Sequence, residues 1–443
     1  MTMISRASTP DAERWRIYNK IAWRIMPLIL LGYTLAGLDR ANVAFAKLQM
    51  GSDLGLSDAM YGFGAGIFFV GYCLFEIPSN MILHKVGARL WLARIMIVWG
   101  LISAAMMFVT TPAQFYAMRF LLGIAEAGFY PGALLYLTYW FPRFARGQAI
   151  SILLLGTGLS AIVGSPLAGI IMQFMDEIAG WRGWQWLFLI EGLPAAILGV
   201  VVLLVLRNRP GEAKWLTPRE QDIVASDLAA EHDAQANTAA GHRNFGDAFR
   251  NPNIWCLVLA NFCNLCTLYG IQFWLPTIIQ RVGQTTIFAT GLIAAGFAMI
   301  PMAVLLLSAR HSDKTGERRW HAAMGFIASL VGLVVAGTFS DNIFILLAGL
   351  CLAQCGVQAA SAVIFSLPAT FVVGAAAAAG VALITTIGNF AGYTSPWVIG
   401  LLNDATGSFS AAFYGLSVVA LCGAGFVLLT PALRASKGAA PAA

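Results

Sequence analysis

Charged side chains are scarce in this sequence. Asp, Glu, Lys and Arg together make up 11% of its 443 residues, whereas hydrophobic residues make up 59% and Gly alone accounts for 45 residues. About a quarter of the residues in a soluble globular chain are charged. The shortage therefore excludes that class, and the composition is typical of an integral membrane protein.

Other signatures are missing as well. The apolar segments are continuous runs of about 20 residues, so the sequence does not predict an outer-membrane β-barrel, whose strands are short and alternating. No Gly-rich loop ends in Gly-Lys-Ser/Thr, which argues against ATP-driven transport by this chain.

The seven cysteines all fall in apolar runs, and "CNLC" at 263–266 has no second pair or nearby His, so we expect no disulfides, metal or cofactor. "HRNFGD" at 242–247 has an acyltransferase-like spacing but no catalytic context, and no enzyme is predicted.

The chain contains twelve apolar segments long enough to be membrane-spanning helices. A polar stretch at 207–252 divides them into two sets of six. Within it, residues 217–232 favour a solvated linker, with an amphipathic surface helix capped by Thr217 as the alternative. The predicted parts are a segment 1–20, a six-helix half 21–206, a central loop 207–252, a six-helix half 253–431 and a tail 432–443. The predicted spans are near 21–47, 59–83, 90–110, 114–141, 148–174, 184–206, 253–279, 286–308, 321–339, 343–367, 376–403 and 410–431.

The distribution of basic residues predicts the orientation. The first 20 residues have no compact apolar core with a small-residue cleavage site, so no signal peptide is expected. With a cytoplasmic N-terminus, most Lys and Arg fall in cytoplasmic segments, as the positive-inside rule requires. We therefore expect a multi-pass protein of the cell (inner) membrane with both termini in the cytoplasm. The net charge of +6 follows from this topology, and no nucleic-acid partner is expected.

The two halves of the sequence contain an internal repeat. The loop after the second span, "HKVGARL" from His84, matches the loop after the eighth span, "DKTGERR" from Asp313. Independently, Ser-Pro pairs at 165–166 and 395–396 repeat with almost the same spacing. Two separate matches at one period indicate a duplicated six-helix unit.

Twelve spans, a central loop and these two matching loops resemble the major facilitator superfamily. The segments "LDRANVAFA", "FEIPSN", "RFLLGIAEAGFYPG" and "GWQWLFLIEGLP" further resemble its anion:cation symporter family, which includes tartrate-, galactonate- and phthalate-type organic-anion:proton symporters. The first loop departs from the superfamily pattern in having His84 where Asp is usual. The resemblance implies an all-α fold of two pseudo-symmetric six-helix halves. It also implies gating or structural roles for loop residues Lys85, Arg89, Asp313 and Arg318.

Four ionisable residues lie deep in the first and fourth spans: Asp39, Arg40, Arg119 and Glu126. An ionised side chain at that depth costs about 3 kcal/mol or more. Arg119 and Glu126 share a helix face about 10.5 Å apart along the axis, so they can flank a ligand or the first-span charges. Asp39 and Arg40 point about 100° apart, so one can face the fourth span and the other a cavity. The alternative is a neutral ion-pair network that only fixes helix packing.

The resemblance assigns roles to these four residues. In the resembled family the two acids carry protons and the two arginines bind the substrate anion, which implies proton coupling by Asp39 and Glu126 and substrate binding by Arg40 and Arg119. Fully ionised, the set is neutral. Protonating one acid leaves one positive charge, which a monocarboxylate neutralises, so proton and anion favour each other's binding.

The remaining charges in the spans of the first half have less defined roles. Glu76 and Arg94 lie at matching depths in the second and third spans, which predicts a structural or gating ion pair. Glu191, in the sixth span, has no obvious partner and receives no role.

The second half offers neutral hydrogen-bonding side chains instead of charges. Asn389 and Tyr393, beside the second Ser-Pro pair, are the strongest substrate-binding candidates there, and Tyr72 is their counterpart in the first half. These groups favour a hydroxy or sugar acid such as tartrate or galactonate over an aromatic acid such as phthalate. Aromatic residues flank the same positions: Phe262, Phe273, Trp274, Phe390 and Trp397.

Together these features predict a secondary active transporter that takes up a small organic carboxylate with protons by alternating access. The expected partners are the anion, protons and the lipid bilayer, and the chain is expected to work as a monomer. The alternative from a different class is an anion channel or a membrane sensor.

Overall fold

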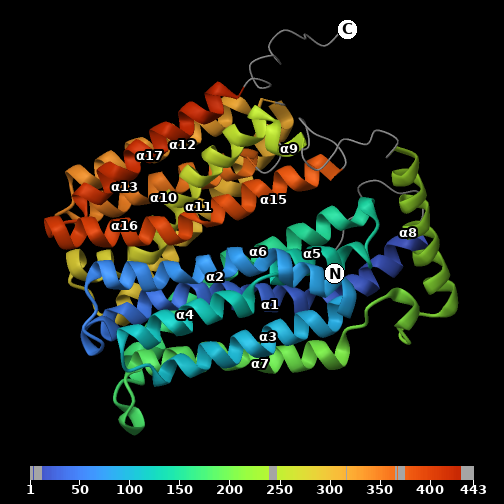
Figure 1. Cartoon of the computed structure of the whole chain (residues 1–443), viewed down its shortest axis with the longest axis horizontal. Helices are drawn as coiled ribbons and strands as arrows, with labels where there is room; N and C mark the ends of the chain where they lie inside the picture. Colours follow the sequence, from blue (N-terminus) through green and yellow to red (C-terminus); the bar gives the residue numbers. More distant parts are fainter. Residues whose placement is uncertain are drawn as a thin grey trace.

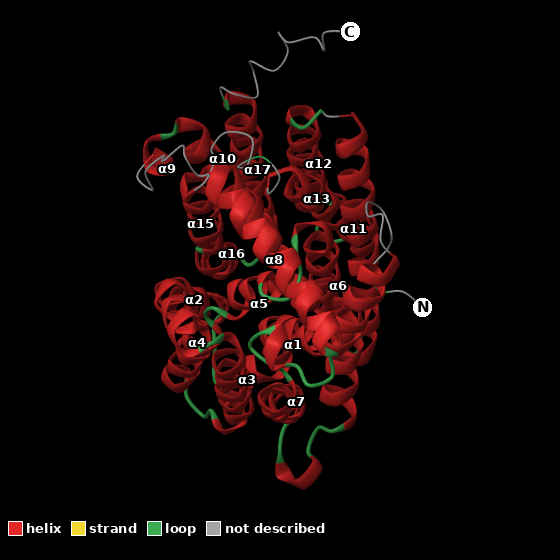
Figure 2. Cartoon of the chain, turned by 90° about the vertical axis from the view of Figure 1, so that its right-hand side faces the viewer, coloured by secondary structure: helices red, strands yellow, loops and turns green. Residues whose placement is uncertain are grey.

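The computed structural model describes residues 3, 12–238, 247–315, 317–364, 367 and 375–430, and within them every regular element is a helix. The long helices form two groups, α1 to α7 and α10 to α17, which lie side by side (Figures 1 and 2). This arrangement confirms the predicted all-α fold of two halves. The α-helices are α1 (Ala12–Asp53), α2 (Asp58–Val86), α3 (Ala88–Ala105), α4 (Pro112–Glu126), α5 (Phe129–Thr138), α6 (Arg143–Phe174), α7 (Gly183–Val205), α8 (Pro218–Thr238), α9 (Asp247–Arg250), α10 (Pro252–Gly283), α11 (Ile287–Thr315), α12 (Arg319–Thr338), α13 (Ile343–Ile364), α15 (Ala375–Asn389), α16 (Ala391–Thr406) and α17 (Ser410–Leu429).

Eleven helical stretches of the described residues are long and apolar enough to cross a membrane, one fewer than predicted. The remaining predicted span, 376–403, contains two shorter helices, α15 and α16, which are separated at Phe390. Large apolar side chains face outward from the bundle, such as Phe344, which is 82% exposed, and Leu204, which is 65% exposed. Such surfaces are solvated by lipid and not by water.

The fourth predicted span is also broken, because α4 ends at Glu126 and α5 begins at Phe129. Gly128 between them has φ of 90°, a conformation that other residues rarely adopt. Pro131 has no N–H, so it cannot bond the carbonyl of Ala127 as a helical residue would. The hydroxyl of Ser79 donates to that carbonyl instead, at 2.7 Å. The sequence "AEAGFYPG" therefore places Glu126 at the end of a half-length helix.

The contacts between the two halves include the helix pairs α2 with α16 and α6 with α11. Along α2 and α16 the backbones approach so closely that a side chain at Gly62, Gly66 or Gly400 would collide with the opposite helix. Gly291 of α11 lies equally close to the backbone of α6 at Ser165. Small residues that let helix backbones touch are typical of membrane bundles.

The repeated Ser-Pro pairs occupy equivalent places in the two halves. The pair at 165–166 lies in α6 and the pair at 395–396 in α16, and each of these helices packs across to the opposite half. In the first repeated loop, Gly87 has φ of 95° and Arg89 donates from Nε to the carbonyl of Leu203 at 2.7 Å, which ties the loop to the end of α7. Gly316 of the second loop lies outside the described residues.

The central loop contains α8, which runs crosswise to the bundle helices (Figure 1). Thr217 and Glu220 cap its start reciprocally, with the Thr217 amide donating to Glu220 at 2.8 Å. Lys20 pairs with Glu220 at 2.7 Å, and the Tyr18 hydroxyl donates to Asp227 at 2.9 Å. The favoured interpretation as a solvated linker is wrong for this part of the loop, because these pairs and the buried Val224 fix the helix against α1.

Candidate functional site

An ion pair between α1 and α4 forms the centre of the candidate site. Arg40 donates to the same oxygen of Glu126 from Nε at 2.7 Å and from Nη2 at 2.6 Å. The Glu126 side chain is 1% exposed, whereas that of Arg40 is 24% exposed. A charge of the fourth span therefore meets a charge of the first, as expected. The second Glu126 oxygen is buried without a hydrogen-bond partner, so the pair leaves hydrogen-bonding capacity unused.

Aromatic rings of α2 lie beneath the two arginines. The Arg40 guanidinium lies 5.0 Å from the ring of Tyr72 and 5.7 Å from that of Phe68. The Arg119 guanidinium also lies over Phe68, 5.0 Å from the centre of its ring. Cation–π contacts of this kind hold a guanidinium in place without consuming its N–H donors. Tyr72 thus lies beside Arg40, and its predicted role in substrate binding stays a prediction.

Arg119 is completely buried and only partly bonded. Its Nη2 donates to the carbonyl of Ala65 at 3.2 Å, while Nε and Nη1 have no hydrogen-bond partner. Glu126 and Asp39 are the acids that act on it electrostatically. A buried cation with unfilled donors is costly unless some state of the protein supplies an acceptor. Because the Arg119 side chain is completely buried in this conformation, a ligand could reach it only after the helices move.

Asp39 points away from Arg40, toward α3. Ser103 of α3 donates to Asp39 Oδ1 at 2.6 Å, and Asn42 donates to the same oxygen at 3.3 Å. The Asp39 side chain is completely buried, and its Oδ2 has no hydrogen-bond partner. The expectation that the adjacent charges diverge is confirmed, but the partner surface of Asp39 is α3 and not a cavity. The sequence did not reveal this because Ser103 is one of many hydroxyls in the spans.

The neutral candidates of the second half lie at its broken helix. Asn389 is the last residue of α15 and accepts from the Tyr269 hydroxyl of α10 at 3.4 Å. The Tyr269 ring lies 4.6 Å from the ring of Phe69 on α2, so it contacts the first half. Tyr393 lies in a cluster of rings with Phe63, 6.0 Å away, and Trp397, 5.5 Å away. Glu126 and Asn389 therefore both lie at ends of half-length helices, where transporters commonly bind their substrates.

The predicted ion pair between Glu76 and Arg94 is not formed. Glu76 accepts from the hydroxyl of Thr386 on α15 at 3.3 Å, so it faces the other half. Arg94 instead lies 4.7 Å from the ring of Trp91 on its own helix. Matching depth is not sufficient for a contact, because the side chains leave α2 and α3 on different faces.

The remaining gating candidates lie at or near the repeated loops. Lys85 is exposed and Arg89 is tied to α7, while Arg318 precedes α12 as its N-cap residue. The side chain of Asp313 lies outside the described residues. Their predicted gating roles stay predictions.

A charged cluster that sequence reasoning missed joins the two halves where α1 ends and α2 begins. We call it the Asp58 latch, formed by Lys47, Asp58, Arg281, Asn403 and Asp404. Asp58 pairs with Lys47 at 2.5 Å and with Arg281 of α10 at 2.8 Å, and it also accepts from Asn403 of α16. Asp404 accepts from the backbone amide of Asp58 at 3.0 Å. Lys47 and Arg281 lie at or near the outer ends of predicted spans, but nothing in the sequence relates either of them to Asp58.

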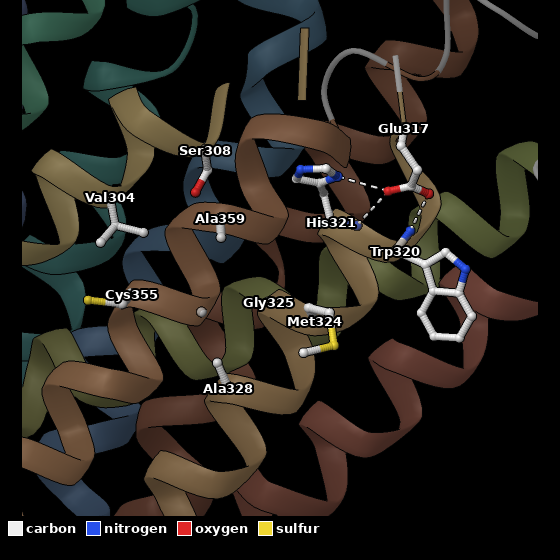
Figure 3. Close-up of a pocket in the computed structure, with 11 residues that line it drawn as sticks. Val304, Ser308, Glu317, Trp320, His321, Met324, Gly325, Ala328, Cys355 and Ala359 are labelled. Atoms are coloured by element: carbon white, nitrogen blue, oxygen red, sulfur yellow. Dashed lines mark hydrogen bonds and ion pairs between the residues drawn. The ribbon is translucent and has the colours of Figure 1, made fainter. Parts of the chain in front are cut away.

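A cavity of about 370 Å³ lies elsewhere, between α11, α12 and α13 of the second half (Figure 3). Its polar rim is Glu317, which accepts from the backbone of Trp320 at 2.7 Å and from the ring of His321 at 2.8 Å. Its walls are mostly apolar or small residues, such as Met324 and Gly325. None of the candidate substrate or proton residues lines it, so it is not the site described above.

Comparisons with known proteins show which family shares this architecture. A family model described as "Major Facilitator Superfamily" matches residues 29–314. The chain is 43% identical to the "Putative metabolite transport protein NicT" of Pseudomonas putida, over 94% of each chain. It is 45% identical to a "Putative tartrate transporter" of Agrobacterium vitis, over 91% of this chain and 93% of that one.

A solved structure shares the same fold. The crystal structure of a bacterial homologue of the human lysosomal transporter Spinster, in an inward-facing and occupied conformation, aligns with a TM-score of 0.77 at 17% identity, covering 94% of this chain and 98% of that one. At that level of identity the likeness concerns the fold alone.

The apolar bundle, the broken helices and the transporter-named relatives define a multi-pass membrane transporter and not an enzyme. The chain belongs to the major facilitator superfamily.

Proposed function

We propose that this protein is a secondary active transporter that carries a small organic carboxylate together with protons by alternating access. Arg40 binds the carboxylate with Arg119, Tyr72, Asn389 and Tyr393 completing the site, while Asp39 and Glu126 exchange protons. The relatives whose printed names include tartrate support the substrate class, because they match almost the whole chain.

The observation that carries this proposal is the Arg40–Glu126 pair. The buried Glu126 occupies the donors of a partly exposed Arg40 through one oxygen only. A proton on Glu126 would weaken that ion pair and free the guanidinium for a carboxylate, whose two oxygens match its planar fork. Protonation and anion binding would then favour each other at a single pair of residues.

The orientation and the domain boundaries are part of the proposal. We place both termini in the cytoplasm of an inner-membrane protein, with halves at 21–206 and 253–431 joined by the loop 207–252. An anion entering against an inside-negative potential loses about 2.3 kcal/mol per charge per 100 mV. At least one proton must accompany it to cancel that cost, so symport is the favoured mode of uptake.

In this orientation the Asp58 latch closes the outer side of the protein. The latch joins α1 and α2 of the first half to α10 and α16 of the second half. Alternating access requires such cross-half contacts to break when the protein opens outward. The conformation described here is therefore assigned as closed to the outside.

Two classes of carboxylate compete as the proposed substrate, a hydroxy or sugar acid and an aromatic acid. Tyr269 and Asn389 provide neutral hydrogen-bonding groups that suit a hydroxy or sugar acid. The rings of Phe69 and Tyr269, whose centroids are 4.6 Å apart, and the cluster around Tyr393 would suit an aromatic acid. We favour the hydroxy acid because each half contributes a hydroxyl or amide beside Arg40.

The test is transport by the purified protein in proteoliposomes. An imposed pH gradient, acidic outside, should drive accumulation of tartrate or galactonate, and a protonophore should abolish it. A panel that adds phthalate and a deoxy analogue distinguishes the two substrate forms. Accumulation that ignores the pH gradient would refute proton coupling, and single-channel currents would favour the channel alternative.

A further inference from the structure

Glu191 is a buried acid that the proposed mechanism does not use. It lies in α7 and is 2% exposed, and both of its carboxyl oxygens are buried without a hydrogen-bond partner among the described residues. Among the residues that the structure describes, no Lys or Arg forms an ion pair with it. An ionised carboxylate in that environment is very costly, so a proton is the simplest group that can satisfy it.

Helix packing places Glu191 beside Asp39. The next residue, Gly192, packs so tightly on α3 that a side chain there would approach the Ser103 Cβ to 3.0 Å. Ser103 is the residue that donates to Asp39. Asp39 acts electrostatically on Glu191, and the Asn42 amide lies close to Glu191 without forming a well-directed hydrogen bond; both belong to α1. The two acids therefore share one pocket between α1, α3 and α7.

The hydrogen-bonding groups of this pocket do not balance. Its acceptors without a well-directed donor are Asp39 Oδ2, Asn42 Oδ1 and both oxygens of Glu191, and the one further donor, the indole N–H of Trp99, lies near Asp39. Trp99 lies four residues before Ser103 on the same face of α3. Acceptors thus outnumber donors among the described residues, and each proton added to a carboxyl converts one acceptor into a donor.

Other charges face the pocket from α4. Arg119 acts favourably on ionised Asp39, and Glu126 acts against it. Arg40 is turned toward Glu126, and Ser103 and Trp99 of α3 are uncharged. One cation therefore faces two acids, so the pocket holds a single negative charge most favourably.

We propose that Asp39 and Glu191 form a proton-sharing carboxyl pair, in which Glu191 is the proton reserve for Asp39. The proton passes from an oxygen of Glu191 to one of Asp39, and the net charge of the pair stays at −1 during this transfer. Release of that proton from Asp39 toward the transport path takes the pair to −2, and rebinding restores it. This inference rests on the proposed proton-coupled transport and adds a second titrating group to it.

The test compares Glu191→Gln with Glu191→Asp in proteoliposomes. Gln has the same shape but no charge, so Asp39 loses its negative neighbour and gives up its proton at lower pH. The alkaline limit of pH-gradient-driven uptake should therefore move down by about one pH unit, or about tenfold in proton concentration. Glu191→Asp restores the carboxyl and should restore the wild-type midpoint. Glu177→Gln, which removes an exposed carboxyl near Arg182, is the matched control.

The outcomes separate the two proposals. Wild-type uptake that does not respond to a pH gradient overturns the proposed function. Coupled wild-type uptake with an unchanged midpoint in folded Glu191→Gln overturns only the carboxyl pair. Infrared titration gives a second readout that does not depend on folding of that variant. The wild type should show the buried-carboxyl steps of Asp39, Glu126 and Glu191, and Asp39→Asn should remove one step and move the Glu191 step to lower pH. A Glu191 step that keeps its wild-type midpoint in Asp39→Asn overturns the pair.

Discussion

The two halves contribute opposite chemistry to the same site. The first half supplies charge: Arg40, Glu126, Arg119 and Asp39 are buried or half-buried on α1 and α4. The second half supplies neutral groups, chiefly Tyr269 and its acceptor Asn389. Both halves carry the repeated loop and Ser-Pro motifs, and each has one broken helix at the candidate site, but the breaks fall in non-equivalent spans, the fourth and the eleventh. The two halves therefore differ at the candidate site in backbone as well as in side chains.

This asymmetry separates two tasks. Charged groups in a low-dielectric interior respond strongly to one another, so coupling of proton and anion is most effective when all of them belong to one rigid half. Neutral donors and acceptors discriminate between substrates without disturbing that balance. The predictions below test this division, beginning with the largest effect.

Changes to the arginines should have the largest effect. Arg40→Lys retains the charge but loses the planar pair of donors, so carboxylate affinity should fall by about 10- to 100-fold. Arg119→Lys should also fail, because the Lys ammonium cannot present the planar pair of N–H donors that a carboxylate accepts. Affinity is measured by thermal shift with a carboxylate panel, and the exposed Arg143→Lys is the control. Normal affinity in both variants would remove the first half from substrate binding.

Substitutions of the two acids should affect proton-driven accumulation and substrate exchange differently. Asp39→Asn and Glu126→Gln should abolish pH-gradient-driven accumulation, since an amide keeps hydrogen bonding but cannot release a proton. At least one of them should retain substrate exchange between equal concentrations. Counterflow and gradient-driven uptake measured on the same vesicles give the answer. Intact gradient-driven accumulation in both variants would rule out these coupling residues.

The Asp58 latch should govern the opening of the outer side. Asp58→Asn removes the charge shared by Lys47 and Arg281, which should shift the equilibrium toward the outward-open form by about 1–3 kcal/mol. Spin labels at Ser52 and Ala405, on a cysteine-free background, would report longer distances in a larger fraction of molecules. An unchanged distance distribution would show that the latch does not hold the halves together.

A change at Asn389 should affect substrate choice more than coupling. If Asn389 binds a substrate hydroxyl, Asn389→Ala should weaken a hydroxy acid by about 1–3 kcal/mol and leave its deoxy analogue nearly unaffected. Competition assays with both ligands measure this difference. Equal losses for the two ligands, or phthalate outcompeting tartrate and galactonate in the wild type, would favour the aromatic acid.

The smallest effect concerns the central loop. The Lys20 ammonium lowers the pKa of the Glu220 carboxyl, so this pair stabilises α8 at neutral pH and the contribution is lost as pH falls through the lowered pKa. An exposed pair of this kind contributes at most about 1 kcal/mol. Hydrogen exchange of residues 218–231 should therefore rise only modestly in acid. Glu220→Gln should show the raised exchange already at neutral pH.

The fold was predictable because it depends on features that sequence displays directly. Continuous apolar runs gave the spans, and the paired Ser-Pro motifs indicated the duplication that α6 and α16 reflect. Two spans were misjudged in form, since hydropathy across 114–141 and 376–403 does not reveal the interruptions near Gly128 and at Phe390.

The sequence predicted the charged residues of the candidate site, but it did not predict the directions in which their side chains point. Glu126 was expected near a first-span charge because helical periodicity fixes its face, and Arg40 meets it. The rotation of α1 within the bundle decides whether Asp39 or Arg40 faces a given helix. Ser103, which is distant in sequence, helps to fix that rotation through its hydrogen bond to Asp39. The same limitation explains the failed Glu76–Arg94 pair and the missed latch, whose partners lie far apart in sequence.

The bare backbone contact between α2 and α16 affects how the protein moves. At Gly62, Gly66 and Gly400 backbone meets backbone, and side-chain contacts of this helix pair, such as Phe63 with Tyr393, lie beside these points. Dispersion attraction falls steeply once such a contact widens by even about 1 Å. A slightly opened interface has therefore lost its attraction before lipid or water can fill the gap. Half-open forms should be sparsely populated, and the passage between states should be abrupt and not gradual.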